Sequence, residues 1–361
     1  MEDIIVIGCG VVGASIAYGL LKKGIPVTMI DEGTSGFKAS KGNFGLVWCQ
    51  GKGFNNKEYS RITFQSCQDW EGFSQQLEAD SGLPVDYENK GGLYFLFDEK
   101  SHLDRIQRLQ SIKEASEGKI TYQMLDHQEL KQAYPALGSE VYSASYCKHD
   151  GTCDPLKLVY ALQAAVIKLG GKIVTGKVNN IISAGGLTKV TTTNISLSAS
   201  KVVIAAGLGN SDLSKCVGID TPLKAIKGQI IVSQRLPECL PIPSLQVRQT
   251  SEGTVICGDS HEDVGLNTST TTDIMQKISK RAIKILPSLA NKNVNRVWGA
   301  LRVMTPDTIP IYEQSEQVKG VFNVSCHSGV TLAAFHTNEL ASHIINGELP
   351  DNLSAFSGGR F

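Results

Sequence analysis

A glycine-rich turn near the first residue constrains the fold of this chain more than any other feature. The apolar run of residues 4–7 leads into Gly8-Cys9-Gly10-Val11-Val12-Gly13, a G-x-G-x-x-G motif, and a helical segment follows. In such a motif the first glycine makes a tight turn, the second admits a pyrophosphate, and the third allows close helix packing. A second strand ends at Asp31, where a carboxylate accepts hydrogen bonds from ribose hydroxyls. The sequence therefore predicts a Rossmann-like dinucleotide site that includes Gly8, Gly10, Val11, Val12, Gly13, Asp31 and Glu32.

The motif alone leaves the identity of the dinucleotide open. An acid at the strand end disfavours a ribose 2′-phosphate, and hence NADP, but NAD and FAD both remain. An NAD domain is usually contiguous, whereas glycine-rich segments recur here at residues 39–53, 205–207 and 327–331. A fold that starts at residue 1 and is completed by the last strand and helix indicates a long cofactor contacted by distant segments. This pattern favours FAD over NAD.

Length and charge exclude several classes of protein. The 361 residues suffice for two domains, or for one domain with an inserted lobe. Lys+Arg and Asp+Glu are equal at 35 each, so the chain lacks the basic excess expected of a nucleic-acid or anionic-membrane binder. No apolar run approaches the ~20 residues that a membrane span needs.

Cysteine usage and the first residues suggest a cytoplasmic protein. The nine cysteines are scattered without a C-x-x-C motif, which is typical of reduced thiols. Cys147 and Cys153 are the closest pair and leave a metal or disulfide alternative open, although no metal is expected. The acidic start Met1-Glu2-Asp3 does not resemble a signal peptide.

Periodicity and capping residues predict the secondary structure. Asp154 followed by Pro155 is typical of a helix start, and Asp273 is the expected cap of a later helix. The apolar run 202–206 ends at Gly207, as expected of a buried parallel strand that meets a ligand at its carboxyl end. Within one predicted helix, Leu103, Ile106 and Leu109 form the apolar side. Helices are predicted over residues 60–77, 100–117, 155–169 and 331–345, and strands over 91–97, 172–175, 188–193, 197–205 and 321–324.

Five motifs in sequence order resemble one known family. They are residues 8–31, Ala205-Ala206-Gly207, Lys227-Gly228-Gln229, Arg302 with Thr305-Pro306-Asp307 and Pro310, and His327-Ser328-Gly329 with Thr331-Leu332. Together they resemble the D-amino-acid oxidase, glycine oxidase and sarcosine oxidase family of FAD-dependent amine oxidoreductases, over essentially the full length. The segment 39–53 is most similar to opine oxidases, hydroxyproline dehydrogenases and the dehydrogenase subunits of hydrogen cyanide synthase.

The resemblance implies an α/β fold in which a substrate domain is inserted into a Rossmann-like FAD-binding domain. The FAD-binding domain would comprise residues 1–85, 140–222 and 300–361. The substrate domain, α+β with a mostly antiparallel sheet, would comprise residues 86–139 and 223–299. Some members attach flavin through a cysteine several residues before Thr-Pro-Asp. This chain has Ala300 and no cysteine in that neighbourhood, so noncovalent FAD is expected.

The implied reaction is oxidation of the C–N bond of a small amino or imino acid by hydride transfer to flavin N5, giving an imine. Glycine, D-proline or hydroxyproline, and an N-substituted amino acid all fit. The electron acceptor stays open between oxygen and the cofactor of a partner subunit, and so does a homo- or hetero-oligomeric state. An NAD-dependent dehydrogenase and a noncatalytic flavoprotein are the alternatives from other classes.

Arg302 and the segment around Thr331 are the main functional candidates that the resemblance implies. Arg302 matches the arginine whose planar guanidinium binds the substrate carboxylate. The alternative is a structural arginine that forms an ion pair with Asp307 or another acid. Gly329, Val330 and Thr331 would begin the last helix below the flavin N1–C2=O edge and stabilise the charge that develops there. The alternative for Thr331 is an ordinary first-turn residue.

The remaining candidates are weaker. Lys52 would lie near N5 or activate oxygen, unless it is solvated, and His327 would face the ring or act as a general base. Val178 resembles the position whose backbone pairs with adenine. The predicted catalytic residues are thus Arg302, His327 and Lys52. The remaining cofactor-binding predictions are Ser40, Lys41, Asn43, Gly45, Leu46, Ala206, Gly207 and Gly299.

Overall fold

The apolar run that precedes the glycine motif is a central strand of an eight-stranded sheet. A computed structural model of the chain describes residues 2–33 and 38–361. In it, β1 (Glu2–Ile7) pairs in parallel with β2 (Val27–Asp31) on one side and with β11 (Ser196–Ile204) on the other. The strand order across the sheet is β16-β17-β11-β1-β2-β8, with β16 (Ile311–Gln314), β17 (Val321–Ser325) and β8 (Lys172–Thr175).

Most strand pairings in this sheet are parallel, as predicted from the apolar run 202–206. β17 is parallel to β11 and β8 is parallel to β2, whereas β16 at the edge is antiparallel. A hairpin of β9 (Val178–Ala184) and β10 (Leu187–Thr192) pairs with β11. The α/β fold class predicted from the sequence is therefore confirmed.

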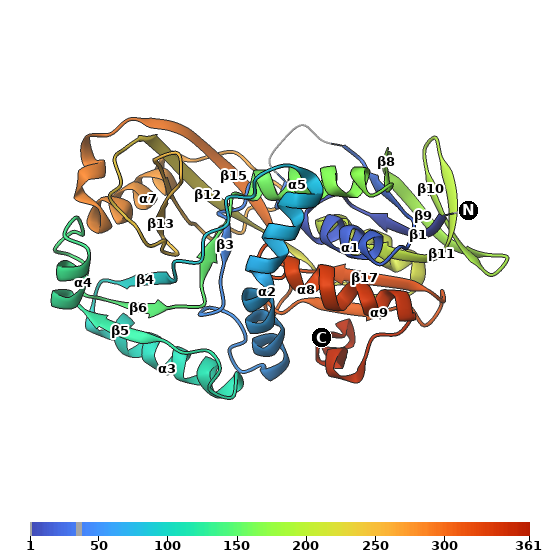
Figure 1. Cartoon of the computed structure of the whole chain (residues 1–361), viewed down its shortest axis with the longest axis horizontal. Coiled ribbons are helices and arrows are strands. Elements are labelled where there is room, and N and C mark those ends of the chain that lie inside the picture. Colours follow the sequence, from blue (N-terminus) through green and yellow to red (C-terminus); the bar gives the residue numbers. More distant parts are fainter. Residues whose placement is uncertain (1, 34–37) are drawn as a thin grey trace.

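Helices from separate parts of the chain cover one face of the sheet. They are α1 (Val11–Lys22), α2 (Lys57–Ser81), α5 (Pro155–Lys168), and a C-terminal run of α8 (Ala333–Phe335), the π-helical η4 (His336–Leu340) and α9 (Ala341–Asn346). Figure 1 shows α1 close to this C-terminal run. The large side chains of Tyr18, Trp70 and Phe335 are fully buried between these helices and the sheet. A second, smaller core that includes Ile204 and Val321 lies on the other face.

Two antiparallel sheets lie to the left of the parallel sheet in Figure 1. One has the order β13-β14-β12-β15, with β13 (Val247–Gln249), β14 (Thr254–Cys257), β12 (Lys224–Arg235) and β15 (Val294–Met304). The other has the order β4-β6-β5, with β4 (Gly92–Leu96), β6 (Ser143–Cys147) and β5 (Gln123–Asp126). The helices beside them are α3 (Glu99–Ala115), α4 (His127–Ala133) and α7 (Thr272–Ile285).

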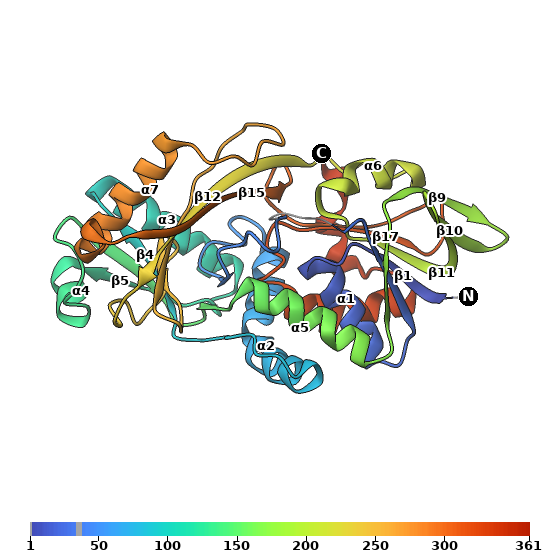
Figure 2. The ribbon, with the colours of Figure 1, turned by 90° about the horizontal axis from the view of Figure 1, so that it is seen from above.

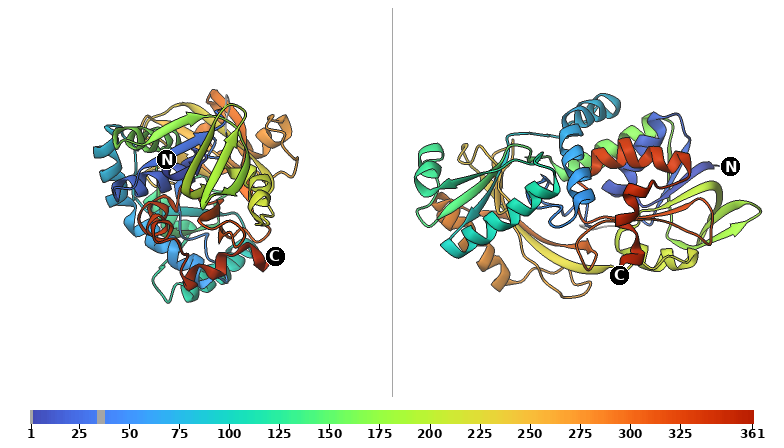
Figure 3. Two further views of the ribbon diagram at one scale, coloured as in Figure 1. Left: turned by 90° about the vertical axis from the view of Figure 1, so that its right-hand side faces the viewer. Right: turned by 90° about the horizontal axis from the view of Figure 1, so that it is seen from below.

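The long strands β12 and β15 connect this part of the molecule with the parallel sheet. Figure 2 shows them running from the region of α7 towards β17, and Figure 3 gives the views from the right-hand side and from below. A short ribbon of β3 (Leu46–Val47) and β7 (Gly151–Thr152) lies between the larger sheets in space. The side chains of Phe95, Ile231 and Ile285 share a separate core. The arrangement agrees with an inserted lobe, while the domain bounds stay a prediction.

Local signals located the helices well, but two helix starts were wrong. Asp154 caps α5 and Pro155 follows it, as predicted. The N-cap of α7 is Thr271, and Asp273 lies in the first turn, where its charge favours the helix dipole without capping. The last helix starts at Ala333 and not at Thr331, because the side chains of Ser66 and Trp70 bind the Thr331 carbonyl and the backbone N–H of Trp48 binds its hydroxyl. Among the described residues, no helix is long and apolar enough to cross a membrane.

The contact between α1 and the C-terminal helical run provides a test of the packing. A Cβ on Gly19 of α1 would overlap the carbonyl oxygen of Thr337, so Gly19→Ala must push the two elements apart. We expect a loss of about 1–3 kcal/mol in the free energy of unfolding. Gly72→Ala is the control, because a Cβ at this exposed position in α2 meets no atom within 4 Å and alanine favours a helix. Thermal unfolding should show a lower midpoint for Gly19→Ala and an equal or higher midpoint for Gly72→Ala. Equal effects of both substitutions would contradict this packing.

Candidate active site

Two cavities meet at the carboxyl ends of the parallel strands. The glycine-motif cavity, of about 1020 Å³, is lined by residues that follow β1, β2 and β11, among them Gly8, Asp31 and Ala206. The Arg302 cavity, of about 660 Å³, is lined by residues of β15, α3 and the segment 39–52. Four residues line both cavities: Ala39, Leu301, Val303 and Cys326. The two spaces are therefore neighbours and suit an elongated ligand with one end in each.

The glycine motif has the close backbone approaches that its sequence predicts. Gly8 has a φ of +108°, and a Cβ there would overlap the carbonyl oxygen of Ala205. A Cβ on Gly10 would lie 2.9 Å from Ser40 Oγ, which accepts a 3.0 Å hydrogen bond from the backbone N–H of Val11. Gly10 is the N-cap of α1 and has no side chain to satisfy the free N–H groups of the first turn. This turn is thus shaped to receive an anion such as a pyrophosphate.

Asp31 contacts the glycine turn directly. Its Oδ2 accepts from the backbone N–H of Cys9 at 2.8 Å, and its Oδ1 accepts from that of Gly33 at 2.9 Å. Asp31 and Glu32 both line the glycine-motif cavity, where Glu32 also pairs with Lys38 at 2.8 Å. Each carboxylate oxygen can accept a second hydrogen bond, so these contacts are compatible with a ribose on Asp31. The ribose contact itself stays a prediction.

The structure brings most of the predicted cofactor residues to these two cavities. The glycine-motif cavity is lined by Gly8, Gly10, Val12, Asp31, Glu32, Ser40, Val178, Ala206, Gly207 and Gly299. The Arg302 cavity is lined by Asn43, Leu46, Lys52, Arg302, His327, Val330 and Thr331. Lys41 instead lies over the ring of Tyr160, at 5.5 Å, and lines neither cavity. Val11, Gly13, Gly45 and Gly329 also line neither cavity.

The turn before the last helix lies against the start of α1. A Cβ on Gly329 would be 2.9 Å from Val12 Cγ2. Among the described residues, none accepts a hydrogen bond from the backbone N–H of Gly329, Val330 or Thr331. The Thr331 hydroxyl donates to the Leu46 carbonyl and accepts from the Trp48 N–H, both at 3.2 Å. Thr331 thus joins this turn to β3, and its hydroxyl proton is already used.

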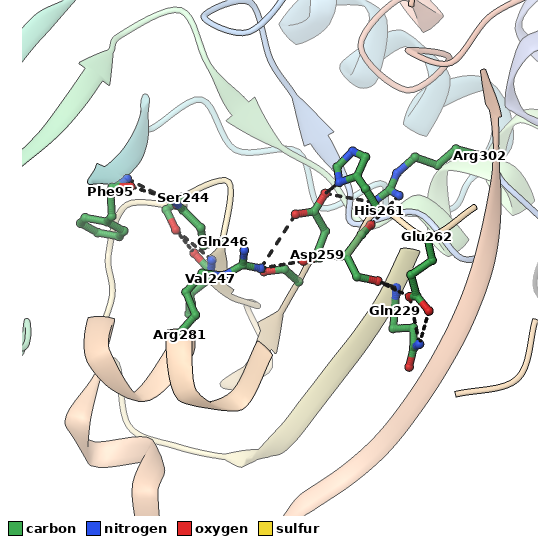
Figure 4. A network of polar contacts seen from close by, with 12 residues as sticks. Phe95, Gln229, Ser244, Gln246, Val247, Asp259, His261, Glu262, Arg281 and Arg302 are labelled. Carbon is green, nitrogen blue, oxygen red and sulfur yellow. Dashed lines mark hydrogen bonds and ion pairs between the residues drawn. The ribbon is translucent and has the colours of Figure 1, made fainter. Parts of the chain in front are cut away.

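Arg302 is held by an acid that its sequence neighbourhood does not reveal. Its Nη2 donates to Asp259 Oδ2 at 2.9 Å, and its Nη1 donates to the Ser260 carbonyl at 2.7 Å (Figure 4). The structural alternative is an ion pair with Asp307 or another acid. Asp307 is the wrong partner, because it binds Arg360 through both carboxylate oxygens, but the pairing with another acid is present in Asp259. Burial lowers the pKa of Arg302, and Asp259 opposes this shift, so the guanidinium stays charged.

The Lys227-Gly228-Gln229 motif fixes the segment that holds Arg302. Lys227 is 1% exposed and forms a 3.0 Å ion pair with Glu262, while Gln229 Nε2 donates to both oxygens of the same carboxylate. Glu262 lies directly after the segment that contains Asp259 and Ser260 (Figure 4). A Cβ on Gly228 would lie 2.5 Å from Arg302 Nη2, so only glycine leaves room for the guanidinium. The motif therefore determines both the position and the partners of Arg302.

Lys52 and His327 line the Arg302 cavity together. Burial lowers the pKa of Lys52 to about 8; the nearby Cys326 opposes this shift, and the charges of Arg302 and Arg108 add to it. Burial also holds the pKa of His327 well below its ordinary value, with further contributions from Lys52 and Arg302. At neutral pH His327 is consequently a neutral imidazole, and a proton leaves Lys52 more easily than an exposed lysine.

Sequence reasoning missed Asp259, Arg105 and Arg108, which also line this cavity. Arg105 is buried: it donates to Gln50 Oε1 at 2.7 Å and stacks on the ring of Tyr94 at 4.3 Å. The buried residues of α3 are Arg105, Leu109 and Ile112, a helical spacing in which an arginine occupies an apolar position. The predicted Leu103 is 53% exposed instead. The signal that could have identified Arg105 is its helical spacing from the apolar residues Leu109 and Ile112.

Comparisons with known proteins agree with this geometry. The model of the family described as FAD dependent oxidoreductase (DAO) matches residues 3–342. The chain is 37% identical to an opine oxidase subunit of Agrobacterium tumefaciens (strain Ach5), an alignment that covers 99% of this chain and 97% of that protein. Glycine oxidase from Geobacillus kaustophilus has a similar structure, with a TM-score of 0.91, 21% identity, and coverage of 98% of this chain and 97% of that one. L-proline dehydrogenase from P. horikoshii has a TM-score of 0.87 and 22% identity, and the match covers 100% and 97% of the two chains.

The environment of Lys52 predicts an unusual titration. Competitive acetylation followed by mass spectrometry should show Lys52 losing its proton near pH 8, against about 10.4 for an ordinary lysine. Removing a neighbouring cation by Arg108→Gln should raise the pKa of Lys52, since the protonated form is then less disfavoured. Titration of Lys52 at the ordinary value for lysine in the unmodified protein would contradict the described environment.

Proposed function

The chain belongs to the DAO family of FAD dependent oxidoreductases, and on this premise we propose that it oxidises the C–N bond of a small amino or imino acid. The observation that carries the proposal is the position of Arg302, a carboxylate-binding side chain in a cavity that adjoins the glycine-motif cavity. Substrates that fit include glycine, D-proline or hydroxyproline, and N-substituted amino acids. The names of the relatives, an opine oxidase subunit, a glycine oxidase and an L-proline dehydrogenase, belong to the same chemical range.

The residues present fit FAD. The turn at Gly8–Gly13 and Ser40 would hold the pyrophosphate, Asp31 or Glu32 the ribose, and the backbone of Val178 the adenine. The flavin would lie where the two cavities adjoin, beside Cys326 and the turn at residues 329–331. Bound FAD supplies a hydride acceptor, N5, which takes the substrate to an imine. Attachment is proposed to be noncovalent, because Ala300 stands where some relatives carry a cysteine.

Arg302 would orient the substrate. Its bonds to Asp259 and Ser260 use one N–H of each terminal nitrogen, and the guanidinium retains further donors for a carboxylate. A carboxylate held by a planar fork cannot rotate freely, so the α-hydrogen points in one direction. Holding the two reacting groups in the right geometry contributes a large part of the rate acceleration in enzymatic reactions. Asp259 and Ser260 act through Arg302 and are positioning residues.

The turn at residues 329–331 would stabilise developing negative charge. Its three backbone N–H groups have no acceptor among the described residues, and they lie next to the start of α1. Fixed backbone donors need no reorganisation when charge appears, which makes them effective in a site that excludes water. His327 and Lys52 would line the substrate position; the low pKa that keeps His327 neutral makes it a poor acceptor for the proton of an ammonium substrate.

A second candidate function differs in the electron acceptor. The relative at 37% identity is named as a subunit, and the alignment covers nearly the full length of both chains. This observation supports a dehydrogenase subunit that passes electrons to the cofactor of a partner and not to oxygen. A hetero-oligomer would then be the working form. The nine cysteines, all free, support the proposed cytoplasmic location.

Arg302→Ala tests the role of the cation. Under anaerobic conditions the flavin of the purified protein should bleach with a subset of a panel of amino acids, imino acids and N-substituted amino acids. In Arg302→Ala the substrate concentration for half-bleaching should rise about 10- to 100-fold, the range expected for losing a charge-assisted hydrogen bond. The FAD content should be unchanged. Unaltered half-bleaching concentrations in the variant would rule out the carboxylate role.

The electron acceptor can be identified with the same substrates. If the chain is a dehydrogenase subunit, it should reduce an artificial dye rapidly while oxygen consumption stays at background. Stoichiometric formation of peroxide by the single chain would instead establish an oxidase and eliminate the second candidate. A chain that releases no flavin on denaturation would contradict both.

A further inference from the structure

Asp150 is a buried carboxylate that the proposed chemistry does not use. It lies in the turn between β6 and β7, is 0% exposed and lines neither cavity. Burial raises the pKa of Asp150 to about 6, and hydrogen bonds from Cys49 and Gln50 oppose this shift, so the carboxyl group is ionised at neutral pH. A buried charge costs free energy unless specific donors satisfy it. The donors of Asp150 therefore indicate what the charge is kept for.

All donors to this carboxylate among the described residues belong to Cys49 and Gln50. Oδ1 accepts from the backbone N–H of Cys49 at 2.6 Å and from that of Gln50 at 3.3 Å. Oδ2 accepts from Gln50 Nε2 at 2.6 Å. Trp48 and Lys52, which flank these two residues in the chain, line the Arg302 cavity. Asp150 thus holds, from behind, the backbone that carries part of the cavity wall.

The Gln50 side chain connects the carboxylate with a buried cation. Its Nε2 also donates to the Gly92 carbonyl at 3.0 Å, while its Oε1 accepts from Arg105 Nη2 and from Ser145 Oγ, both at 2.7 Å. These elements are β4, α3 and β6, so one amide joins three of them (Figure 1). Two donated and two accepted hydrogen bonds are all that an amide can form, and its orientation is fixed. Asp150 and Arg105 are therefore an ion pair bridged by one amide.

We propose that Asp150 is a positioning residue for the C–N oxidation, which fixes Arg105 and the backbone of residues 49–52 as one wall of the Arg302 cavity through the Gln50 amide. This inference rests on the proposed function. Asp259 holds Arg302 on the β15 side of the cavity, and Asp150 performs the corresponding task on the side of α3. A buried ionic network of this kind determines one arrangement of the groups around it. A displacement of about 1 Å in such a wall can lower the rate of a reaction about 100-fold.

Asp150→Asn keeps the shape of the side chain and changes the polarity of one atom. The asparagine oxygen can still accept from the Cys49 N–H, but its NH2 group then faces Gln50 Nε2, which is also a donor. Rotation of the Gln50 amide would turn its oxygen towards the Gly92 carbonyl and its NH2 group towards Arg105. In that orientation Arg105 loses its 2.7 Å acceptor. Either arrangement loosens the wall.

Two measurements on the holoenzyme separate positioning from stability. In anaerobic stopped-flow experiments with the bleaching substrates, the maximum rate constant of flavin reduction should be about 10- to 100-fold lower in Asp150→Asn. The substrate concentration for half-maximal rate should change far less, because Arg302 and its partners are unaltered. Competitive acetylation should show the pKa of Lys52 raised above about 8 in the variant, since a loosened segment exposes the ammonium to water. This second readout needs no substrate.

Asp154→Asn is the matched control. It removes the same charge from the N-cap of α5, outside both cavities, and asparagine caps a helix as well as aspartate. Both readouts should be unaltered in this variant. Ser145→Ala is a milder second variant, which keeps the charge of Asp150 and removes one hydrogen bond to Gln50 and one from Arg105. It should lower the rate constant several-fold, and it decides alone if Asp150→Asn does not retain FAD.

Where an amine bleaches the flavin, the rate constant decides. A rate constant in Asp150→Asn equal to that of the unmodified protein, or lowered equally in Asp154→Asn, overturns the positioning role alone, even if the unfolding midpoint falls. Where no amine bleaches the flavin, the proposed function is overturned and the pKa of Lys52 decides. A raised pKa in Asp150→Asn alone then supports the role of Asp150 in the wall, and an unaltered pKa overturns it as well.

Discussion

β11 pairs in parallel with β1 on one side and with β17 on the other, and the rest of the site depends on this arrangement. Ile204 is in register with Ile7 and with Asn323, so three chain segments leave the sheet at one level. Buried Asn210 strengthens this edge, since its amide nitrogen donates to the carbonyls of Ile204 and Val324. The loops that begin at Gly8, Ala205 and Cys326 consequently form neighbouring walls, as parallel sheets generally allow at the carboxyl ends of their strands.

The antiparallel lobe adds the polar groups that the parallel sheet lacks. β12 and β15 pair along most of their length, and their glycine at position 228 leaves space for Arg302. The buried ion pair of Lys227 and Glu262 then fixes the segment of Asp259. Burying such a pair is not in itself evidence of stability, but it determines one position for the residues around it. The position of Arg302 is thus a property of the pairing of two strands and of one buried ion pair.

Sequence reasoning succeeded where the signal was local. The glycine motif, the cap at Asp154 and the buried run that became β11 each depend on residues close together in the chain. It failed where residues far away in the sequence determine the local structure. The helix expected to start at Thr331 starts at Ala333, because hydrogen bonds from Ser66, Trp70 and Trp48 fix the preceding turn. Asp259 has no local signature at all, and its partnership with Arg302 follows only from the fold. Family resemblance identified Arg302 itself but not what holds it.

A crystal structure with bound FAD is the most direct test of the central claim, that turns from opposite ends of the chain hold opposite ends of one cofactor. The account predicts the pyrophosphate on the backbone of Gly8–Gly13, the adenine beside Val178, and the N1–C2=O edge of the flavin within hydrogen-bond distance of the Gly329, Val330 or Thr331 N–H groups. The ring face would then be turned towards Arg302. A flavin ring bound away from residues 329–331, or a cofactor confined to the glycine-motif cavity, would contradict it.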